Sequence, residues 1–181
     1  AFSIHELAMI VGTEITCRDL VPIFNGFLKD LDEVRIGVLK HLSDFLRLLT
    51  NEVRDEYLEK INEFLTTDNT RNWRFREELA MQLMHILELF SPEDISRHLI
   101  PIALDLAEDR VAQVRHRAFH VLSCMLKHLN QSEDEQLPFA FVNDLLERFA
   151  QCKQAAKRQM FAHICHYILL EGALSPERFA R

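Results

Sequence analysis

The chain has 181 residues, 48% of them apolar, with four glycines and five prolines and a formal net charge of −7. This composition is typical of neither a disordered nor a β-rich chain, and it predicts an all-α protein. The acidic balance argues against a nucleic-acid partner, because nucleic-acid-binding proteins gather Lys and Arg on one face.

The cysteines and the apolar runs predict a protein of the cytoplasm or nucleus. Cys17, Cys124, Cys152 and Cys165 are far apart and form no Cys-x-x-Cys pair, which favours reduced thiols over a disulfide framework. Apolar runs are short and every expected helix carries charges, so we expect no membrane span. The opening residues lack the basic start of a signal peptide.

The first half of the chain predicts one single helix and two helix pairs. In 1–13, Ser3 and Glu6 have the spacing of a capping box and Gly12 the position of a helix end. The partner of this helix is missing, so we expect the chain to be a fragment that begins inside a repeat. Helix pairs follow in 19–50 and 52–90, with helices expected over 19–29, 34–49, 53–65 and 73–90 and with Pro22 in the first turn of its helix.

The second half predicts two more pairs, in 91–130 and 137–171. Ser91 is a natural N-cap before Pro92, and Pro101 is expected to kink the first helix. The polar stretch 130–136 is the best candidate for a mobile turn. Helices are expected over 114–129, 137–150 and 154–170, and 175–181 is expected to open a further helix.

A repeated turn signal sets the fold class. A turn aspartate followed by Val-Arg or Trp-Arg recurs, and its arginines Arg35, Arg74 and Arg115 are 39 and 41 residues apart. A period near 40 made of two helices is typical of HEAT and armadillo repeats. We therefore predict a single array over 1–181: an α-solenoid (α-α superhelix) of about four and a half HEAT-type antiparallel helix pairs.

Helical spacing predicts which faces of the second helices are buried. One predicted stripe contains Phe75, Leu79, Leu83, Ile86 and Phe90, with Glu77, Met81, His85 and Glu88 opposite. A second predicted stripe contains Val114, Ala118, Val121, Leu122, Met125 and Leu129.

The turn residues allow a structural and a functional interpretation. The structural one is a ladder of carboxylate–guanidinium pairs between neighbouring repeats, formed by Asp30, Arg35, Asp68, Arg74, Asp109 and Arg115. In the functional one, the arginines contact a partner, and Arg76 could serve either purpose. Trp73, the single tryptophan, is expected either in the core at a repeat junction or as an exposed binding anchor.

No catalytic, cofactor or metal site is predicted. His116, His120, Cys124 and His128 recur every four residues, a spacing at which neighbours can chelate zinc or nickel. The row drifts around the helix, so at most two or three of them could share an ion; His163, Cys165 and His166 are a weaker set. Templates such as G-x-S-x-G, the P-loop and H-E-x-x-H are missing from the sequence, and a binding protein is expected rather than an enzyme.

Four stretches, 1–8, 20–42, 67–80 and 101–115, resemble the C-terminal HEAT repeats of the protein phosphatase 4 regulatory subunit 1 family. The W-R-x-R at 73–76 is also similar to the scaffolding A subunit of protein phosphatase 2A. The resemblance implies a noncatalytic regulatory or scaffolding subunit. Such a protein would bind the catalytic subunit of serine/threonine protein phosphatase 4 and direct its activity to substrate proteins.

The resemblance also implies where the catalytic subunit docks, on the ridge of turns over 30–35, 69–76 and 109–115. The residues expected to contact it are Asp30, Asp32, Glu33, Arg35, Arg71, Trp73, Arg74, Arg76 and Arg115. Two alternatives stay open. One is a HEAT-repeat adaptor or transport module that binds a helix or an acidic peptide on its concave face, and the other is a metal-dependent enzyme.

Overall fold

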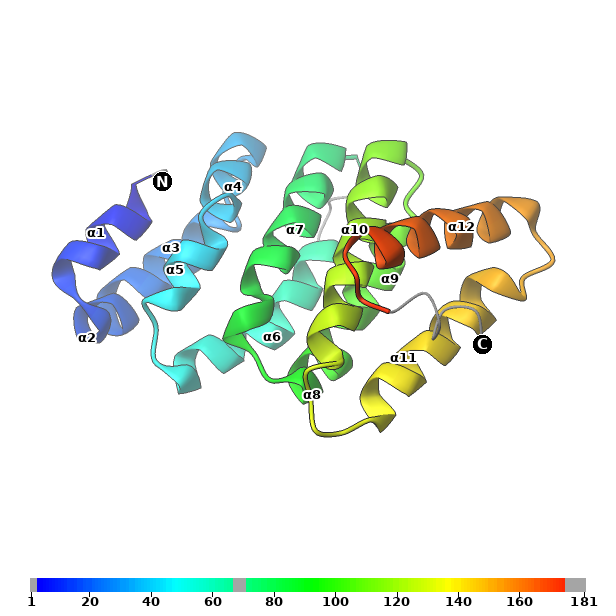
Figure 1. The fold of residues 1–181 in the computed structure, drawn as a ribbon. Helices are drawn as coiled ribbons and strands as arrows, with labels where there is room; N and C mark the ends of the chain where they lie inside the picture. The colour runs from blue at the N-terminus through cyan, green and yellow to red at the C-terminus, as the bar shows by residue number, and fades with distance from the viewer. Residues whose placement is uncertain (1–2, 67–70, 175–181) are drawn as a thin grey trace. The chain divides into compact units, whose positions relative to one another are not determined.

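The structure is a computed structural model that describes residues 3–66 and 71–174. Two compact units divide the chain, Ala1–Phe90 and Ser91–Arg181. Within the described ranges the secondary structure is helical, with no strand (Figure 1). None of the described helices is long and apolar enough to cross a membrane. Asp68, Asn69 and the helix expected over 175–181 lie outside the described residues.

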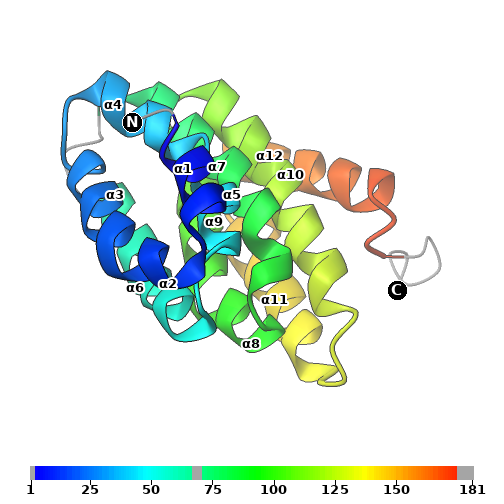
Figure 2. The same ribbon diagram turned by 90° about the vertical axis from the view of Figure 1, so that its left-hand side faces the viewer.

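The first unit is built from short and long helices in chain order. They are α1 (Ile4–Val11), α2 (Thr13–Ile15), the π-helical η1 (Thr16–Leu20), α3 (Val21–Phe27), α4 (Asp32–Leu39), α5 (Leu42–Arg47), α6 (Asn51–Thr66), α7 (Trp73–Ile86) and the 3₁₀ turn η2 (Leu87–Leu89). In Figure 2, α3 and α6 lie on one side of the unit and α1, α5 and α7 on the other. This two-layer arrangement is the one expected of stacked helix pairs.

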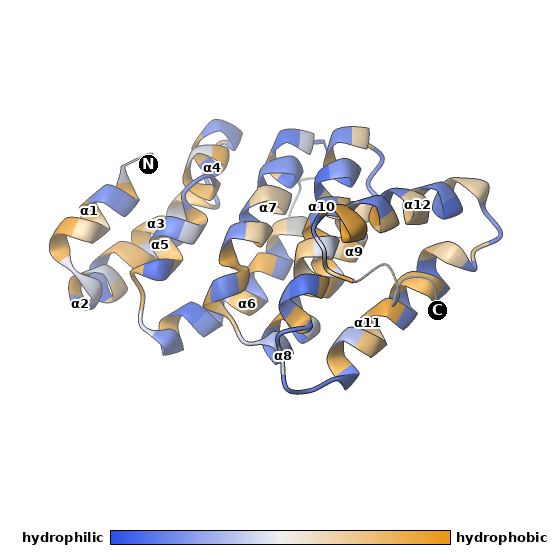
Figure 3. Cartoon of the chain, in the orientation of Figure 1, coloured by the Kyte–Doolittle hydropathy of each residue, from blue (hydrophilic) through white to orange (hydrophobic). Residues whose placement is uncertain are grey.

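The predicted packing face of α7 is confirmed. Phe75, Leu79, Leu83, Ile86 and Phe90 are all buried. Of the four residues predicted opposite them, His85 and Glu88 are exposed, and Glu77 and Met81 are half-buried. Figure 3 shows the same alternation of hydrophobic and hydrophilic residues along α7. The two layers meet through aromatic rings: Phe24 stacks on Phe45 with centroids 4.1 Å apart, and Tyr57 meets Phe24 edge-on at 6.2 Å.

One prediction at a helix start was wrong and another is confirmed. Ser3 precedes α1 but its side chain makes no cap hydrogen bond, so the capping box does not form. Pro22 lies in the first turn of α3, as predicted, and the π-helical turn Thr16–Leu20 directly precedes that helix. A proline has no N–H and its ring clashes with the carbonyl four residues earlier, and a π turn accommodates both.

The second helix of the first pair, predicted as one helix over 34–49, is two helices. α4 ends at Leu39 and α5 begins at Leu42, which leaves backbone groups at the junction without helical partners. Gln82 of α7 satisfies two of them: its Oε1 accepts from the N–H of Ser43 at 3.1 Å, and its Nε2 donates to the carbonyl of Lys40 at 3.0 Å. The buried Gln82 side chain therefore joins α7 to the break.

The second unit contains α8 (Pro92–Asp94), η3 (Ile95–Leu99), α9 (Ile100–Ala107), α10 (Ala112–Leu129), α11 (Gln136–Leu145), η4 (Leu146–Ala150) and α12 (Ala155–Leu170). Both η segments are π-helical. The Ser91 cap is confirmed, since its Oγ accepts from the N–H of Asp94 at 3.1 Å. Pro101 lies in the first turn of α9, directly after the π turn η3, and the kink expected there stays a prediction.

The core of the second unit is centred on α10, which packs against α9 and α12. All six residues of its predicted stripe are fully buried. The predicted loop 130–136 is a turn held by side chains: Ser132 Oγ accepts from the N–H of Asp134 at 3.1 Å, and Asp134 Oδ1 from the N–H of Gln136 at 2.9 Å. Its mobility stays a prediction.

Candidate functional site

The turn between α3 and α4 presents acidic residues to solvent. The N–H of Asp30 donates to the carbonyl of Phe27 at 3.2 Å, and Asp30 Oδ1 accepts from the N–H of Leu31 at 2.7 Å, which closes the turn. Asp30, Asp32 and Glu33 are exposed, and Leu31 is 72% exposed between them. Asp32 and Glu33 occupy the first turn of α4, where carboxylates favour the helix because they face its positive end.

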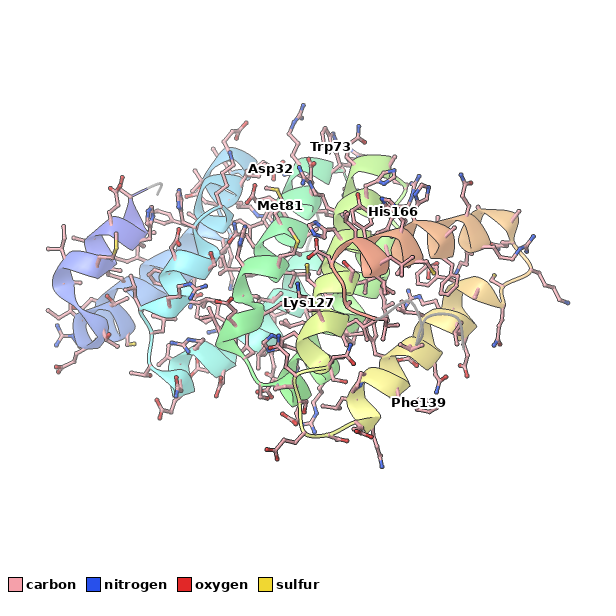
Figure 4. The ribbon with its side chains drawn as sticks, viewed as in Figure 1. Asp32, Trp73, Met81, Lys127, Phe139 and His166 are labelled. Atoms are coloured by element: carbon pink, nitrogen blue, oxygen red, sulfur yellow. The ribbon has the colours of Figure 1, made fainter. Side chains whose placement is uncertain are left out.

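The start of α7 presents basic residues at the same end of the first unit. Asn72 caps the helix by accepting from the N–H of Phe75 at 3.1 Å. Arg71 and Arg74 are exposed, and the guanidinium of Arg74 lies 4.8 Å from the centroid of the Trp73 ring. Figure 4 shows Asp32 and Trp73 at this end, at the starts of α4 and α7. Acidic and basic side chains therefore occupy neighbouring helix starts.

Trp73 fits neither of its two predicted roles fully. Its side chain is half-buried, so it is neither a core residue nor a fully exposed anchor. Stacking of Arg74 on its ring covers one part of the indole by a cation–π contact. The arrangement offers a partner an aromatic face next to a cation.

The side chains of Arg35 and Arg76 are packed against the protein and have little exposure to solvent. The Arg35 side chain is 12% exposed, lies 3.5 Å from Asp32 and places its guanidinium 4.7 Å from the centroid of the Phe75 ring. Arg76 is 7% exposed. Both are therefore poorly placed for direct contact with a partner, and their expected role there stays a prediction.

Arg115, in the second unit, has a local role that sequence reasoning missed. Its Nη1 donates to the carbonyls of Asp109 and Arg110, at 2.8 and 3.0 Å, while Asp109 Oδ1 accepts from the N–H of Val111 at 2.8 Å. Arg158 repeats the pattern at the start of α12 through the carbonyls of Cys152 and Lys153. In both turns the arginine donates to the carbonyls five and six residues before it. This shared spacing could have identified Arg158 from the sequence. The inter-repeat ladder stays a prediction.

A charge network of the second unit was not predicted. Arg148, in η4, contacts Asp105 at 2.8 Å and also Glu108, and Lys157 of α12 lies 2.6 Å from Glu108. Burial raises the pKa of Glu108, but the hydrogen bonds from Lys157 and Arg148 outweigh burial, and the net pKa is lowered. These contacts tie the ends of α9, α11 and α12 together.

The histidine row on α10 is divided between different neighbours. His116 meets the His163 ring edge-on, with centroids 5.2 Å apart. His120 Nε2 instead lies 2.8 Å from Glu171 Oε1, and the thiol of Cys124 is close to both. Burial raises the pKa of Cys124, and burial raises the pKa of Cys165 to about 11.

A second group was not predicted. His5 and His41 stack with centroids 3.9 Å apart and planes 12° apart, and Asp44 Oδ2 lies 3.5 Å from His41 Nδ1. No sequence pattern indicates this pair, because the two histidines are far apart in the chain and belong to no common motif.

A groove of about 910 Å³ lies beside the acidic turn, within the first unit. It is lined by Asn25, Leu28, Lys29, Asp30, Leu31, Asp32, Glu33, Arg35, Lys60, Glu63 and Phe64. Its lining combines apolar side chains with carboxylates and ammonium groups, a composition suited to a polypeptide partner rather than to a small apolar ligand.

Comparisons with known proteins agree with this picture. Residues 1–64 match the family model for the middle domain of protein phosphatase 4 regulatory subunit 1. Serine/threonine-protein phosphatase 4 regulatory subunit 1 of Rattus norvegicus and that of Homo sapiens are each 52% identical to this chain over 180 residues, 99% of the chain. The alignment covers 19% of each relative, so the chain spans about a fifth of their length.

A more distant relative supports the fold class. The beta isoform of the 65 kDa regulatory subunit of serine/threonine-protein phosphatase 2A from Homo sapiens is 29% identical over 126 residues, 66% of this chain and 20% of that protein. Together with the helix pairs in each unit, this similarity confirms the predicted all-α, HEAT-type fold class. These relatives are named as regulatory subunits, not as catalytic ones.

Proposed function

Because this chain is related over nearly its whole length to the protein phosphatase 4 regulatory subunit 1 family, we propose that it is part of a noncatalytic regulatory subunit of that phosphatase. It binds the catalytic subunit and helps to direct its activity to substrate proteins. The observation that carries the proposal is the 52% identity over 99% of the chain. The free thiols of all four cysteines suit a protein of the reducing cytoplasm or nucleus.

The proposed contact surface in the first unit, called here the charged turn surface, consists of Asp30, Asp32 and Glu33 together with Arg71 and Arg74. The proposal is supported by the exposure of these five residues to solvent, at or just before the starts of α4 and α7. Charges of both signs on neighbouring turns orient a partner of complementary charge and exclude others. Leu31, 72% exposed within the acidic turn, adds apolar area to the same contact.

The test is a pull-down of the phosphatase 4 catalytic subunit, with this 181-residue chain and the full-length protein side by side. Reversal of two carboxylates, Asp32→Lys with Glu33→Lys, should weaken the complex by at least about fivefold, roughly 1 kcal/mol. Folding should change little, because exposed charges contribute about 0–1 kcal/mol to stability. The matched control reverses Glu133 and Glu135, two exposed carboxylates on the turn before α11.

Equal losses from both double reversals would mean that net charge, not the charged turn surface, governs binding. Retained binding after reversal of Asp32 and Glu33 would contradict the proposed surface and favour the concave-face adaptor interpretation. If the full-length protein captures the catalytic subunit and this chain does not, the contact lies in another segment of the full-length protein.

A further inference from the structure

The side chains of His120, Cys124 and Glu171 converge at the place where the end of α12 meets α10. One ligand atom of each, an imidazole nitrogen, the thiol sulfur and a carboxylate oxygen, lies within 4.8 Å of the others. All three side chains are half-buried, so an ion could reach them and still be partly shielded from water. We propose that this cluster is a zinc-binding site, which fastens α12 to α10.

The two ligands on α10 are placed by helix geometry. His120 and Cys124 are four residues apart, so their side chains lie on the same face about one turn apart. The same spacing places two zinc-binding histidines on one helix in the H-E-x-x-H motif. Tyr167 of α12 stacks on the His120 ring, with centroids 5.2 Å apart and planes 20° apart, and so holds the imidazole in place.

Glu171 comes from the residue that follows α12 and brings the third donor. Its Oε1 lies 2.8 Å from His120 Nε2, and its Oε2 lies 3.9 Å from Lys127 Nζ. A tetrahedral zinc ion with bonds of about 2.0–2.3 Å holds its ligand atoms roughly 3.3–3.7 Å apart. The His120–Glu171 contact therefore opens by about half an ångström when the ion enters, and Lys127 continues to hold the other carboxylate oxygen.

The donor set selects zinc over the hard cations. Magnesium and calcium prefer oxygen ligands, whereas a thiolate with an imidazole and one carboxylate suits a borderline ion such as Zn²⁺. Three protein ligands leave one tetrahedral position, which a water molecule can fill.

The other histidine group lacks this geometry. Nitrogen lone pairs lie in the plane of an imidazole ring, and the His5 and His41 rings are nearly parallel at 3.9 Å. Two lone pairs in stacked planes point side by side and cannot meet at one ion about 2 Å from each nitrogen. His116 is likewise turned away from the cluster, toward the ring of His163.

Cobalt titration of the reduced, chelator-treated chain tests the site, because tetrahedral Co²⁺ reports a thiolate ligand by a charge-transfer band in the near ultraviolet. Cys124 is the single thiol in the two histidine groups of the described residues, so that band is specific to the proposed cluster. We expect one equivalent of Co²⁺ to bind, Zn²⁺ to displace it, and Zn²⁺ to raise the melting temperature.

The variants separate ligand loss from misfolding. Cys124→Ser should abolish the band and the zinc-dependent rise in melting temperature. His120→Ala and Glu171→Gln should each weaken zinc binding by at least about 100-fold, since even groups outside the ligand set cost about 10- to 100-fold. Cys165→Ser, a thiol of comparable burial on α12, is the matched control and should behave like the unaltered chain.

Melting temperatures measured without metal show whether each variant folds. Loss of the band in a Cys124→Ser variant that melts normally supports the site. The proposal is overturned if the unaltered chain binds no stoichiometric Co²⁺ or Zn²⁺, if the band survives Cys124→Ser, or if Cys165→Ser removes it.

Discussion

Replacement of Gln82 by methionine tests how the break between α4 and α5 is stabilised. Gln82 is 4% exposed, and its amide makes three hydrogen bonds: with the Ser43 N–H, the Lys40 carbonyl and Glu78 Oε1. Methionine has a similar volume and no amide, so packing is kept while the polar contacts are lost. The change therefore isolates the hydrogen bonds from the cavity that alanine would leave.

The expected loss is about 2–4 kcal/mol in the free energy of unfolding of the first unit, because a buried donor or acceptor left without a partner costs about 1–3 kcal/mol. The Ser43 N–H and the Glu78 carboxylate, which is 6% exposed, are both buried and should bear most of this cost, whereas the Lys40 carbonyl belongs to an exposed residue that water can reach in part.

Denaturant unfolding measures the total, and amide hydrogen exchange at Ser43 locates it. Gln159→Met, on an exposed position of α12, is the matched control and should change stability by no more than about 0.5 kcal/mol. If Gln82→Met unfolds at the same denaturant concentration as the unaltered chain and the Ser43 amide stays protected, the break does not depend on this side chain and the reasoning is refuted.

Three further substitutions are expected to have smaller effects. Trp73→Ala should lower stability by about 1–2 kcal/mol in denaturant unfolding, less than the roughly 3–5 kcal/mol of a fully buried tryptophan, because Trp73 is half-buried; a larger loss would show that the residue behaves as core. Tyr57→Phe removes the 3.0 Å hydrogen bond from the Tyr57 hydroxyl to Asn25 Oδ1 and should cost about 1 kcal/mol in the same assay; no change would mean that water replaces the bond. Glu108→Gln should cost about 1 kcal/mol at pH 7, and melting curves should show the difference from the unaltered chain shrinking as the pH falls below about 4. The pKa of Glu108 is lowered in the folded state, so its contribution is present above the unfolded-state pKa and is lost as the pH falls through the folded-state pKa; a difference that persists at low pH would contradict this.

The fold class and the apolar stripes were predictable because both show in the spacing of residues along the chain. A rotation of about 100° per residue placed Phe75, Leu79 and Leu83 on one face without any knowledge of their neighbours. The same rotation places Gln82 within roughly 20° of Phe75, inside the apolar stripe. A polar residue in that position was a readable sign of a buried amide with a specific partner, although its partners at 40 and 43 could not be identified from the sequence.

Contacts between distant residues were beyond sequence reasoning. Glu171 approaches His120 across 51 positions, and no periodicity links a residue that follows the last helix to the middle of an earlier one. Arg148 likewise reaches Asp105 and Glu108 from the next helix pair. The turn carboxylates drew attention because they repeat, whereas these interactions depend on how two helices cross.

The arginines at the starts of the second helices show why a repeated motif does not imply a repeated role. Arg115 and Arg158 donate to carbonyls of their own turns, whereas Arg35 packs over Phe75 and pairs with Asp32. Arg74 differs from them, because it is exposed and stacks on the Trp73 ring. The residue before Arg35 and before Arg115 is a valine instead of a tryptophan. The guanidinium in this position satisfies whatever acceptor or ring the local turn provides. We therefore expect a partner to be recognised at a repeat whose arginine is exposed to solvent. In the first unit this arginine is Arg74, which lies next to Trp73.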